Sequence, residues 1–542
     1  MSSRKSFILN VLYLIQLAIV GLVITGILPR FIIPFWVAVL VIYILSAKLE
    51  DGVIFFARSI PLFVAIPIAA NFDSLNTWRI LSGLIFLKWA WREQLWKPGW
   101  FSTLPNDRMG VWKWIKTRKI GILLVLLVLI AILSVTQAQN YVLAVKRIIY
   151  FINLSLIGVV AYDLLIKSNG FRQRLIKNLS VPVIIVALVG MAQLASTYFM
   201  DIFQFVDFWA GKVELGLFGS AWANIALKAN TWFAYYGDQL SLRMFSLFPD
   251  SHSFPIFLLL GLPAVFAVAL RKIAGTQNSL KTMFFTRASL LIVFVPIIFL
   301  AAILSGTRGI WVAGLGVLGV VLGIFWLMKR QGAGEWQKDI FKYVASYLAI
   351  FFLLFGAAYY IIASDQFQVS KSDAAMFGKR VRSVLDISET SNARRIEIWK
   401  ASLRSIIKHP LLGVGIGNFP VVVGEDLARA KAGSSAHNLY LNIAAEMGIP
   451  ALIFVLWFFW LLLVKAYKNF LETENPEKAS GPRGFTGCKL ETIYFAAALI
   501  FIPWVLIYSL TDVAIFDERA FLLFVITIGL IFAQKQNHAV GK

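Results

Sequence analysis

Cysteine is almost absent from this sequence, and its scarcity excludes two ways of stabilising a fold. Cys488 is the only cysteine among 542 residues, so no disulfide can form within one chain. No cluster of cysteine and histidine has the spacing of a zinc site. Neither a disulfide framework nor a structural metal is therefore expected.

Charged residues are also scarce, at 15% of the chain, whereas hydrophobic residues make up 59%. Apolar runs long enough to cross a bilayer recur from end to end. The first run lacks a small-residue cleavage pattern after it, which indicates a retained helix. The sequence predicts an all-α polytopic membrane protein with about 12–14 transmembrane helices. We expect spans near residues 7–27, 31–47, 53–70, 77–92, 120–136, 141–165, 181–200, 254–270, 289–305, 309–328, 343–363, 437–465, 491–510 and 517–534.

Lysine and arginine gather in alternate connections between these spans, which predicts the orientation. Such clusters stay on the cytoplasmic side of a membrane. Both termini are therefore expected in the cytoplasm, and the rule explains most of the net charge of +23 without any nucleic-acid partner. The basic connections are residues 91–119, 167–178, 271–287, 329–342, 465–489 and the tail after 532.

Four regions follow from this topology. Residues 1–120 hold the first helices and a basic cytoplasmic loop, residues 121–362 a transmembrane core with an outer loop at 201–253, residues 363–436 a large outer loop, and residues 437–542 the last helices and tail. Loops this long usually carry function. The larger one has 11 Lys and Arg against 7 Asp and Glu, which suits an anionic ligand.

Within the large loop, residues 392–409 (NARRIEIWKASLRSIIKH) predict an amphipathic helix. Its apolar stripe comprises Ile396, Trp399, Leu403, Ile406 and Ile407. The helix can lie on the membrane surface or cover the helix mouths as a lid. The following GVGIGNF lacks the GxGxxG spacing of a dinucleotide site and predicts a turn.

Polar residues also interrupt the apolar run that begins after this loop. The segment SSAHNLYLNIAAEMGIP contains His437, Asn438 and Glu446. Polar side chains are costly in lipid, so we expect these three to face protein or a ligand. His437 is the predicted centre of the chemistry, and Asn438 and Glu446 are predicted to line the site.

Three arginines fall on the same outer side. They are Arg243 in LRMFSLFPD, Arg308 in SGTRGIW and Arg395 in the amphipathic helix. Each alone is compatible with a snorkelling side chain, but several guanidinium groups together hold a diphosphate through bidentate hydrogen bonds. Their convergence with His437 predicts a site for a lipid-linked diphosphate.

The ordered motifs LRMFSLFPD, SGTRGIWVAG, ARRIEIWKASLRSIIKHPLLGVGIGNF and SSAHNLYLNIAAEMGIPAL resemble the O-antigen ligase and polymerase superfamily of bacterial membrane glycosyltransferases, which have a GT-C-type fold. The resemblance implies a multi-pass protein of the bacterial inner membrane with its active site facing the periplasm. It implies an undecaprenyl-diphosphate-linked glycan donor and no metal or other cofactor. By motif, His437 matches the family's histidine, and Arg243, Arg308 and Arg395 match its donor-diphosphate arginines.

Two roles remain open for His437. As a general base it takes a proton from the acceptor hydroxyl, and direct attack on the donor then inverts the anomeric carbon. As an imidazolium it binds the diphosphate instead. His252 is a further candidate for lining the site, and His409 is better explained as a helix cap.

The acceptor also remains open at this stage. Ligation to lipid A-core, polymerisation of a polysaccharide repeat and transfer to a protein hydroxyl share these motifs. A transporter or flippase of lipid-linked oligosaccharide is the alternative from another class, and such proteins usually show internal repeats and midplane polar sites. The outer loops lack a DxD pair, which disfavours metal-dependent oligosaccharyl transfer.

Overall fold

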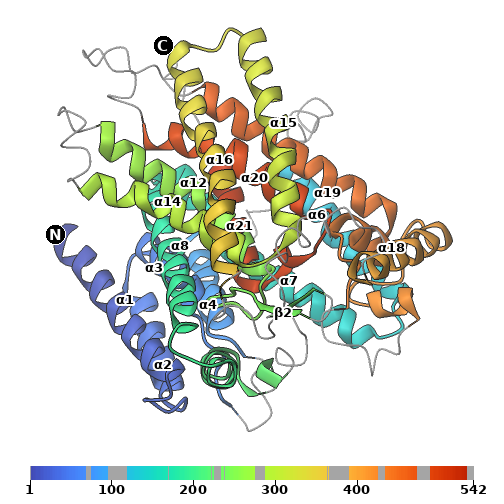
Figure 1. Ribbon diagram of the computed structural model, residues 1–542, viewed down its shortest axis with the longest axis horizontal. Helices are drawn as coiled ribbons and strands as arrows, with labels where there is room; N and C mark the ends of the chain where they lie inside the picture. Colours follow the sequence, from blue (N-terminus) through green and yellow to red (C-terminus); the bar gives the residue numbers. More distant parts are fainter. Residues whose placement is uncertain are drawn as a thin grey trace.

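The chain is almost entirely helical over the residues that the computed structural model describes (Figure 1). Those residues are 2–68, 75–95, 119–168, 170–220, 222–224, 233–236, 239–274, 287–362, 364, 390–424, 434–472 and 489–533. The longer helices are α1 (Ser2–Ile24), α2 (Ile32–Ser46), α3 (Leu49–Ser59), α4 (Thr77–Arg92), α6 (Lys119–Ser134), α7 (Tyr141–Lys167), α8 (Phe171–Ser196), α12 (Ser253–Ala274), α14 (Arg287–Leu304), α15 (Arg308–Arg330), α16 (Glu335–Ile362), α18 (Thr390–Lys408), α19 (Leu439–Leu471), α20 (Leu490–Tyr508) and α21 (Glu518–Phe532).

The architecture is that of an all-α polytopic membrane protein, as predicted. Among the described residues, nine helices are long and apolar enough to cross a membrane: α1, α6, α7, α8, α12, α15, α16, α19 and α20. A helix coincides with each of the 14 predicted spans. The third prediction, 53–70, is wrong in extent, because α3 has 11 residues and ends at Ser59. At 1.5 Å per residue it extends about 16 Å, and Pro61 follows it in a short 3₁₀ turn.

Two helices form the centre of the bundle. Helix α12 packs against α8, α14 and α20, and α20 also contacts α15, α16 and α19. Nearly every residue of both helices is buried within the protein, whereas the outer helices expose most of their apolar surface. In the core, Phe501 stacks on both Phe266 and Trp504.

Short elements occupy the connection between α8 and α12. They are α9 (Ile202–Val206), a π-helical turn (Asp207–Glu214), α10 (Leu215–Phe218) and a hairpin of β1 (Phe233–Tyr236) and β2 (Gln239–Leu242). Arg519 of α21 is fully buried beneath them. Its guanidinium donates to the carbonyl oxygens of Leu247 and Phe63 and lies 4.5 Å from the Phe218 ring centroid. This arginine therefore joins four distant segments of the chain.

Helix α19 is broken at Gly448, where φ is +85°. The predicted glycine turn packs into the break, and Gly413, Gly415 and Gly417 all have positive φ, which confirms the turn. The Gly415 amide donates to the Glu446 carbonyl at 3.0 Å. A Cβ on Gly448 would come within 2.2 Å of the Leu411 oxygen. Glycine is required here because both the backbone angle and the close approach exclude a side chain.

The predicted amphipathic helix is confirmed as α18, which packs over the start of α19. Its Ile398 and Ile406 contact a small buried cluster that contains Phe419 and Ala436. The indole of Trp399 donates to the Ala436 carbonyl at 3.0 Å. Helix α18 is thus fixed to the residue that precedes His437.

Several of the predicted basic connections lie mostly outside the described residues. They are 91–119, 271–287, 465–489 and the tail from 534. The predicted connection at 167–178 is shorter than expected, because α8 already begins at Phe171.

Candidate functional site

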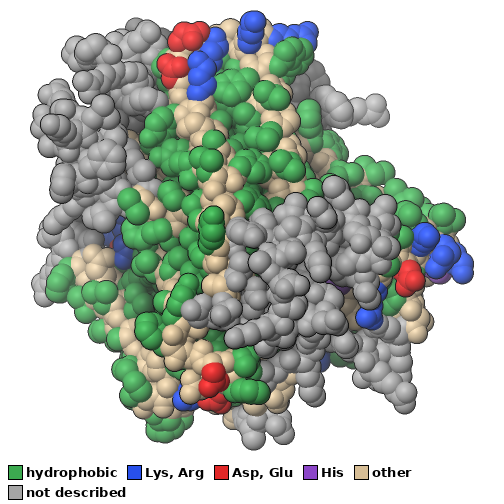
Figure 2. All heavy atoms as spheres, viewed as in Figure 1, with side chains coloured by type: hydrophobic (Ala, Val, Ile, Leu, Met, Phe, Trp, Pro, Cys, Tyr) green, Lys and Arg blue, Asp and Glu red, His purple; other side chains and the backbone are tan. Residues whose placement is uncertain are grey.

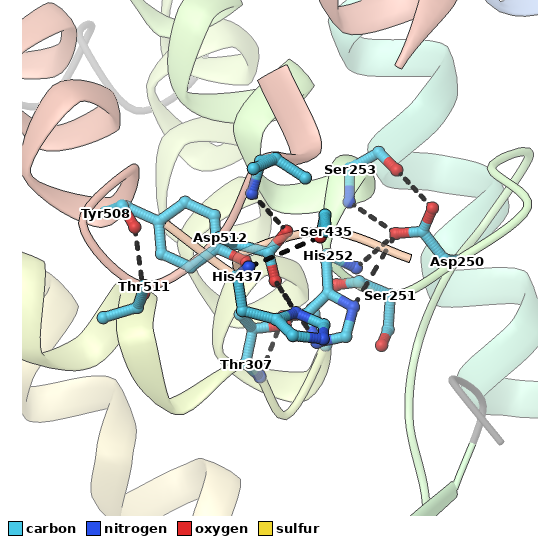
Figure 3. Close-up of polar contacts among 12 residues, drawn as sticks. Asp250, Ser251, His252, Ser253, Thr307, Ser435, His437, Tyr508, Thr511 and Asp512 are labelled. Atoms are coloured by element: carbon cyan, nitrogen blue, oxygen red, sulfur yellow. Dashed lines mark hydrogen bonds and ion pairs between the residues drawn. The ribbon is translucent and has the colours of Figure 1, made fainter. Parts of the chain in front are cut away.

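Four chain segments meet at one end of the helix bundle. They are the turn before α12, the link before α15, the residues before α19 and the turn after α20 (Figure 3). Figure 3 shows His252 and His437 beside one carboxylate, that of Asp512. Polar side chains from distant parts of the sequence therefore form a single cluster.

His437 lies immediately before α19 in a left-handed backbone conformation, with φ at +46°. Its amide donates to the Ser435 hydroxyl at 3.4 Å, and the next residue, Asn438, caps the helix. The Leu439 amide donates to the Ser509 carbonyl at 2.8 Å, which joins this helix start to the turn after α20. The His437 side chain is 41% exposed, so the ring is accessible to a ligand.

Asp512 is the carboxylate between the two histidines. Its Oδ2 lies 3.9 Å from His437 Nδ1 and 4.0 Å from His252 Nε2, while its Oδ1 accepts the Val513 amide at 2.8 Å. Burial alone would raise the pKa of Asp512, but His252, His437 and Arg395 outweigh burial and hold this pKa well below its usual range. Asp512 is therefore a fixed negative charge at neutral pH.

His252 is the second histidine of the cluster and remains neutral at ordinary pH. Burial lowers its pKa to about 4, and the positive charges of Arg243 and Arg395 act in the same direction, against Asp512 and Asp250. A neutral imidazole can donate one hydrogen bond and accept another. His252 thus offers polarity without adding charge.

Arg243 connects this cluster to the link before α15. Its Nε donates to the Ser305 carbonyl at 3.0 Å, and its Nη2 donates to the Gly306 carbonyl at 3.2 Å and the Thr307 hydroxyl at 3.3 Å. The same Nη2 lies 3.5 Å from His252 Nε2. Arg243 both holds the 305–307 link and adds positive charge next to His252.

Arg308 is the first residue of α15 and directly follows this link. The adjacent Gly309 sits so close to the turn after α20 that a Cβ would come within 2.2 Å of the Thr511 hydroxyl. The bare glycine allows the start of α15 to approach Asp512. Arg308 is therefore placed at the edge of the cluster by its backbone.

Arg395 reaches the cluster from α18. Its positive charge lowers the pKa of both His252 and Asp512, which places it within electrostatic reach of both. The bond between Trp399 and Ala436 sets the position of this helix. The structure thus gathers Arg243, Arg308 and Arg395 around the same end of the bundle as the histidines.

Asn438 and Glu446 have other partners in the described structure. The Asn438 side-chain oxygen accepts the amides of Tyr440 and Leu441, both at 3.0 Å. Glu446 is buried, and its carboxylate accepts the backbone amides of Gly417 and Phe419. One residue starts α19 and the other holds the glycine turn, so both position the segment that carries His437.

Asp512 was missed by the sequence reasoning, and so was Asp250, whose carboxylate accepts the amides of His252 and Ser253 at 2.8 Å. A usable signal for Asp512 was present: an acidic residue lies in TDVAIFDER, the short link between the last two apolar runs. The part of the chain that the structure describes contains no group of three or more His, Cys, Asp or Glu side chains placed for a metal ion. Metal-independent action remains a prediction.

Part of the chain matches a known protein family. Residues 292–456 match the family model described as O-antigen ligase. This range contains Arg308, Arg395 and His437, whereas Arg243 and Asp512 lie outside it. No curated protein matches the chain. The resemblance to the O-antigen ligase and polymerase superfamily is confirmed over the matched residues.

Proposed function

We propose that this chain, whose residues 292–456 match the O-antigen ligase family model, transfers a glycan from an undecaprenyl-diphosphate-linked donor to an acceptor hydroxyl. The family match supports an enzyme of the O-antigen ligase or polymerase type in polysaccharide biosynthesis. The observation that supports the finer proposal is that Asp512 Oδ2 lies 3.9 Å from His437 Nδ1 and 4.0 Å from His252 Nε2, with Arg243 Nη2 3.5 Å from the same His252 nitrogen.

The proposed reaction uses His437 as a general base. Nδ1 faces Asp512, so Nε2 is available to take the acceptor proton. The acceptor oxygen then forms a bond to the anomeric carbon of the donor, and the bond from that carbon to the diphosphate oxygen breaks. The lipid diphosphate leaves with its electron pair, and the anomeric configuration inverts. The negative charge of Asp512 stabilises the imidazolium that forms, as a carboxylate does beside other catalytic histidines.

The arginines are assigned to the leaving group. Charge grows on the diphosphate as the glycosidic bond breaks, and guanidinium groups stabilise it most strongly where water is excluded. In support, Arg243 lies beside His252, Arg308 begins α15 directly after the link that Arg243 holds, and Arg395 is within electrostatic reach of His252. Arg243 also has a positioning role, through its bonds to residues 305–307.

The proposed site faces the periplasmic side of the bacterial inner membrane. This follows from the basic connections predicted at the other ends of the helices. Donor lipid, acceptor and bilayer are the proposed partners, and the candidate acceptors are lipid A-core, a growing glycan and a protein hydroxyl.

The test is turnover of an undecaprenyl-diphosphate glycan by the purified full-length protein, in the presence of EDTA and with each acceptor in turn. His437→Ala is expected to lose transfer while still binding donor. His409→Ala is the matched control, because His409 is exposed and directly follows the end of α18. Full activity in His437→Ala would refute the catalytic assignment. Donor movement across a vesicle bilayer without transfer would favour the flippase alternative.

A pH–rate profile separates the two roles of His437. If His437 is a general base, activity falls as the pH falls, because the protonated imidazole can no longer take a proton from the acceptor. An imidazolium that binds the diphosphate loses activity as the pH rises.

A further inference from the structure

Helix α18 exposes an apolar row that its packing against α19 does not use. Ile398 and Ile406 contact the small buried cluster under the helix. Leu403 and Ile407 lie to one side of this packed row and remain 51% and 79% exposed. Leu411, directly after the helix, is 70% exposed. Leu403 and Ile407 are one helical turn apart, Leu411 follows the end of the helix, and we call these three exposed side chains the 403–411 row.

The 403–411 row continues the outward-facing surface of a transmembrane helix. The Ile449 amide of α19 donates to the Pro410 carbonyl at 2.8 Å, so the end of the row touches this helix. Further along α19, Ile453 and Trp460 are 56% and 66% exposed. Helix α19 is a membrane span by length and composition, so these exposed side chains face lipid. The exposed apolar surface of α19 therefore adjoins the end of α18.

Basic side chains border the row. Lys400, Arg404 and Lys408 are exposed on α18, each within one helical turn of Leu403 or Ile407. The only acidic residue of the helix is Glu397. In Figure 2, blue basic side chains lie beside green apolar ones at the right-hand edge, where Figure 1 places α18. An apolar row with a basic margin is the pattern of a helix that lies in a membrane interface.

We propose that α18 is an interfacial anchor that binds an anionic lipid bilayer. The 403–411 row enters the acyl region of the leaflet at the His437 end of the protein, and Lys400, Arg404 and Lys408 contact anionic headgroups. Because Trp399 of the same helix bonds to Ala436, lipid binding holds the residue next to His437 in place. This inference concerns the membrane contact of α18 and holds whether or not the proposed reaction is correct.

The experiment measures the depth of single spin labels on the full-length protein in nanodiscs. Cys488→Ser provides a background without native thiols. Ile407→Cys and Leu411→Cys place labels on the row, and Lys400→Cys is the matched control on the same helix. Accessibility to oxygen reports acyl chains, and accessibility to a water-soluble nickel chelate reports solvent. The nanodiscs contain phosphatidylethanolamine with phosphatidylglycerol, or phosphatidylcholine alone.

In the anionic nanodiscs, labels at 407 and 411 are expected to show high oxygen and low nickel accessibility, with a ratio several-fold above that at 400. High nickel accessibility at 407 would overturn the proposal, because the row would face water. Low accessibility to both reagents would also overturn it, because protein would then cover the row. A ratio at 407 that is unchanged in phosphatidylcholine would refute the headgroup contact.

Discussion

At the residue scale, the site depends on one carboxylate between two histidines. Asp512 is buried and negatively charged, and its Oδ2 lies within 4.0 Å of a ring nitrogen of each histidine. In the proposed reaction, its position opposite His437 Nδ1 leaves Nε2 as the ring nitrogen available to the acceptor. The two histidines differ in role, since His437 is accessible and His252 is mostly buried and neutral.

Asp512→Asn is expected to reduce transfer by about 10²-fold or more, because the amide cannot stabilise an imidazolium. The shape of the side chain is conserved, so donor affinity should change little. The measurement is kcat and KM for the donor in a purified transfer assay. Asp339→Asn is a suitable control, since Asp339 pairs with Lys342 on an exposed helix surface away from the site. Equal losses in both variants would contradict a specific role for Asp512.

The lowered pKa of His252 leads us to expect that the stability of the protein depends on pH. Its pKa in the folded protein is about 4, below the ordinary value of 6.5, so the unfolded chain binds more protons between these values. Stability therefore increases with pH across this window and is lost as the pH falls from 6.5 towards 4, by up to a few kcal/mol (roughly 1.4 per pH unit). The groups that face His252 are Asp250, Asp512, Arg243 and Arg395.

The check is the melting temperature of wild type and His252→Gln in detergent from pH 7 to pH 4. The variant should lose less stability than wild type over this range. His409→Gln, at an exposed histidine, should follow the wild-type curve. Parallel curves for wild type and His252→Gln would show that His252 is not the group that titrates.

At the element scale, the break in α19 determines where His437 lies. Gly448 has φ at +85° and sits against the Leu411 carbonyl, while the glycine turn at 413–417 fills the break. The short segment from His437 to the break is thus held by hydrogen bonds to the turn rather than by a continuous helix. A straight α19 would lose these bonds.

Gly448→Ala is expected to destabilise the protein by about 2 kcal/mol or more. Alanine is strained at the positive φ of this position, and its Cβ would also clash with the backbone of Leu411. Gly323→Ala in α15 is the matched control, because a Cβ there meets nothing within 4 Å. Its expected effect is slight or stabilising. Thermal denaturation of both variants tests the difference, and a melting temperature of Gly448→Ala equal to wild type would contradict the assigned role of the break.

At the scale of the whole molecule, two buried helices support the site. Helices α12 and α20 fill the centre, and the segments next to their ends at the site carry His252 and Asp512. Lipid-facing helices surround them. The polar cluster therefore lies at the ends of two densely buried helices, while the helices around them expose apolar surface.

The predicted orientation has its own test at this scale. A green fluorescent protein fused after Lys542 should fluoresce, because it folds in the cytoplasm. Alkaline phosphatase fused after residue 370 should be active, because it requires export. An inactive phosphatase together with a dark C-terminal fusion would show that the true orientation is the reverse of the predicted one, with His437 on the cytoplasmic side.

The sequence by itself determined the helical membrane fold, the position of most helices, the glycine turn and the amphipathic α18. These features depend on apolar length, helical periodicity and local backbone preference, which are properties of neighbouring residues. The O-antigen ligase resemblance was also readable from local motifs, and the family match confirms it over residues 292–456.

Only the tertiary structure decided which polar residues meet. Asp512 lies 75 positions after His437 and Arg243 lies 194 before it, so no periodicity relates them. Their proximity follows from packing of α12, α15, α19 and α20, which brings four helix ends together. The same packing assigned Asn438 and Glu446 to holding α19 and left the 403–411 row of α18 exposed. Local patterns define elements, but a site made by contacts between distant segments depends on how those elements pack.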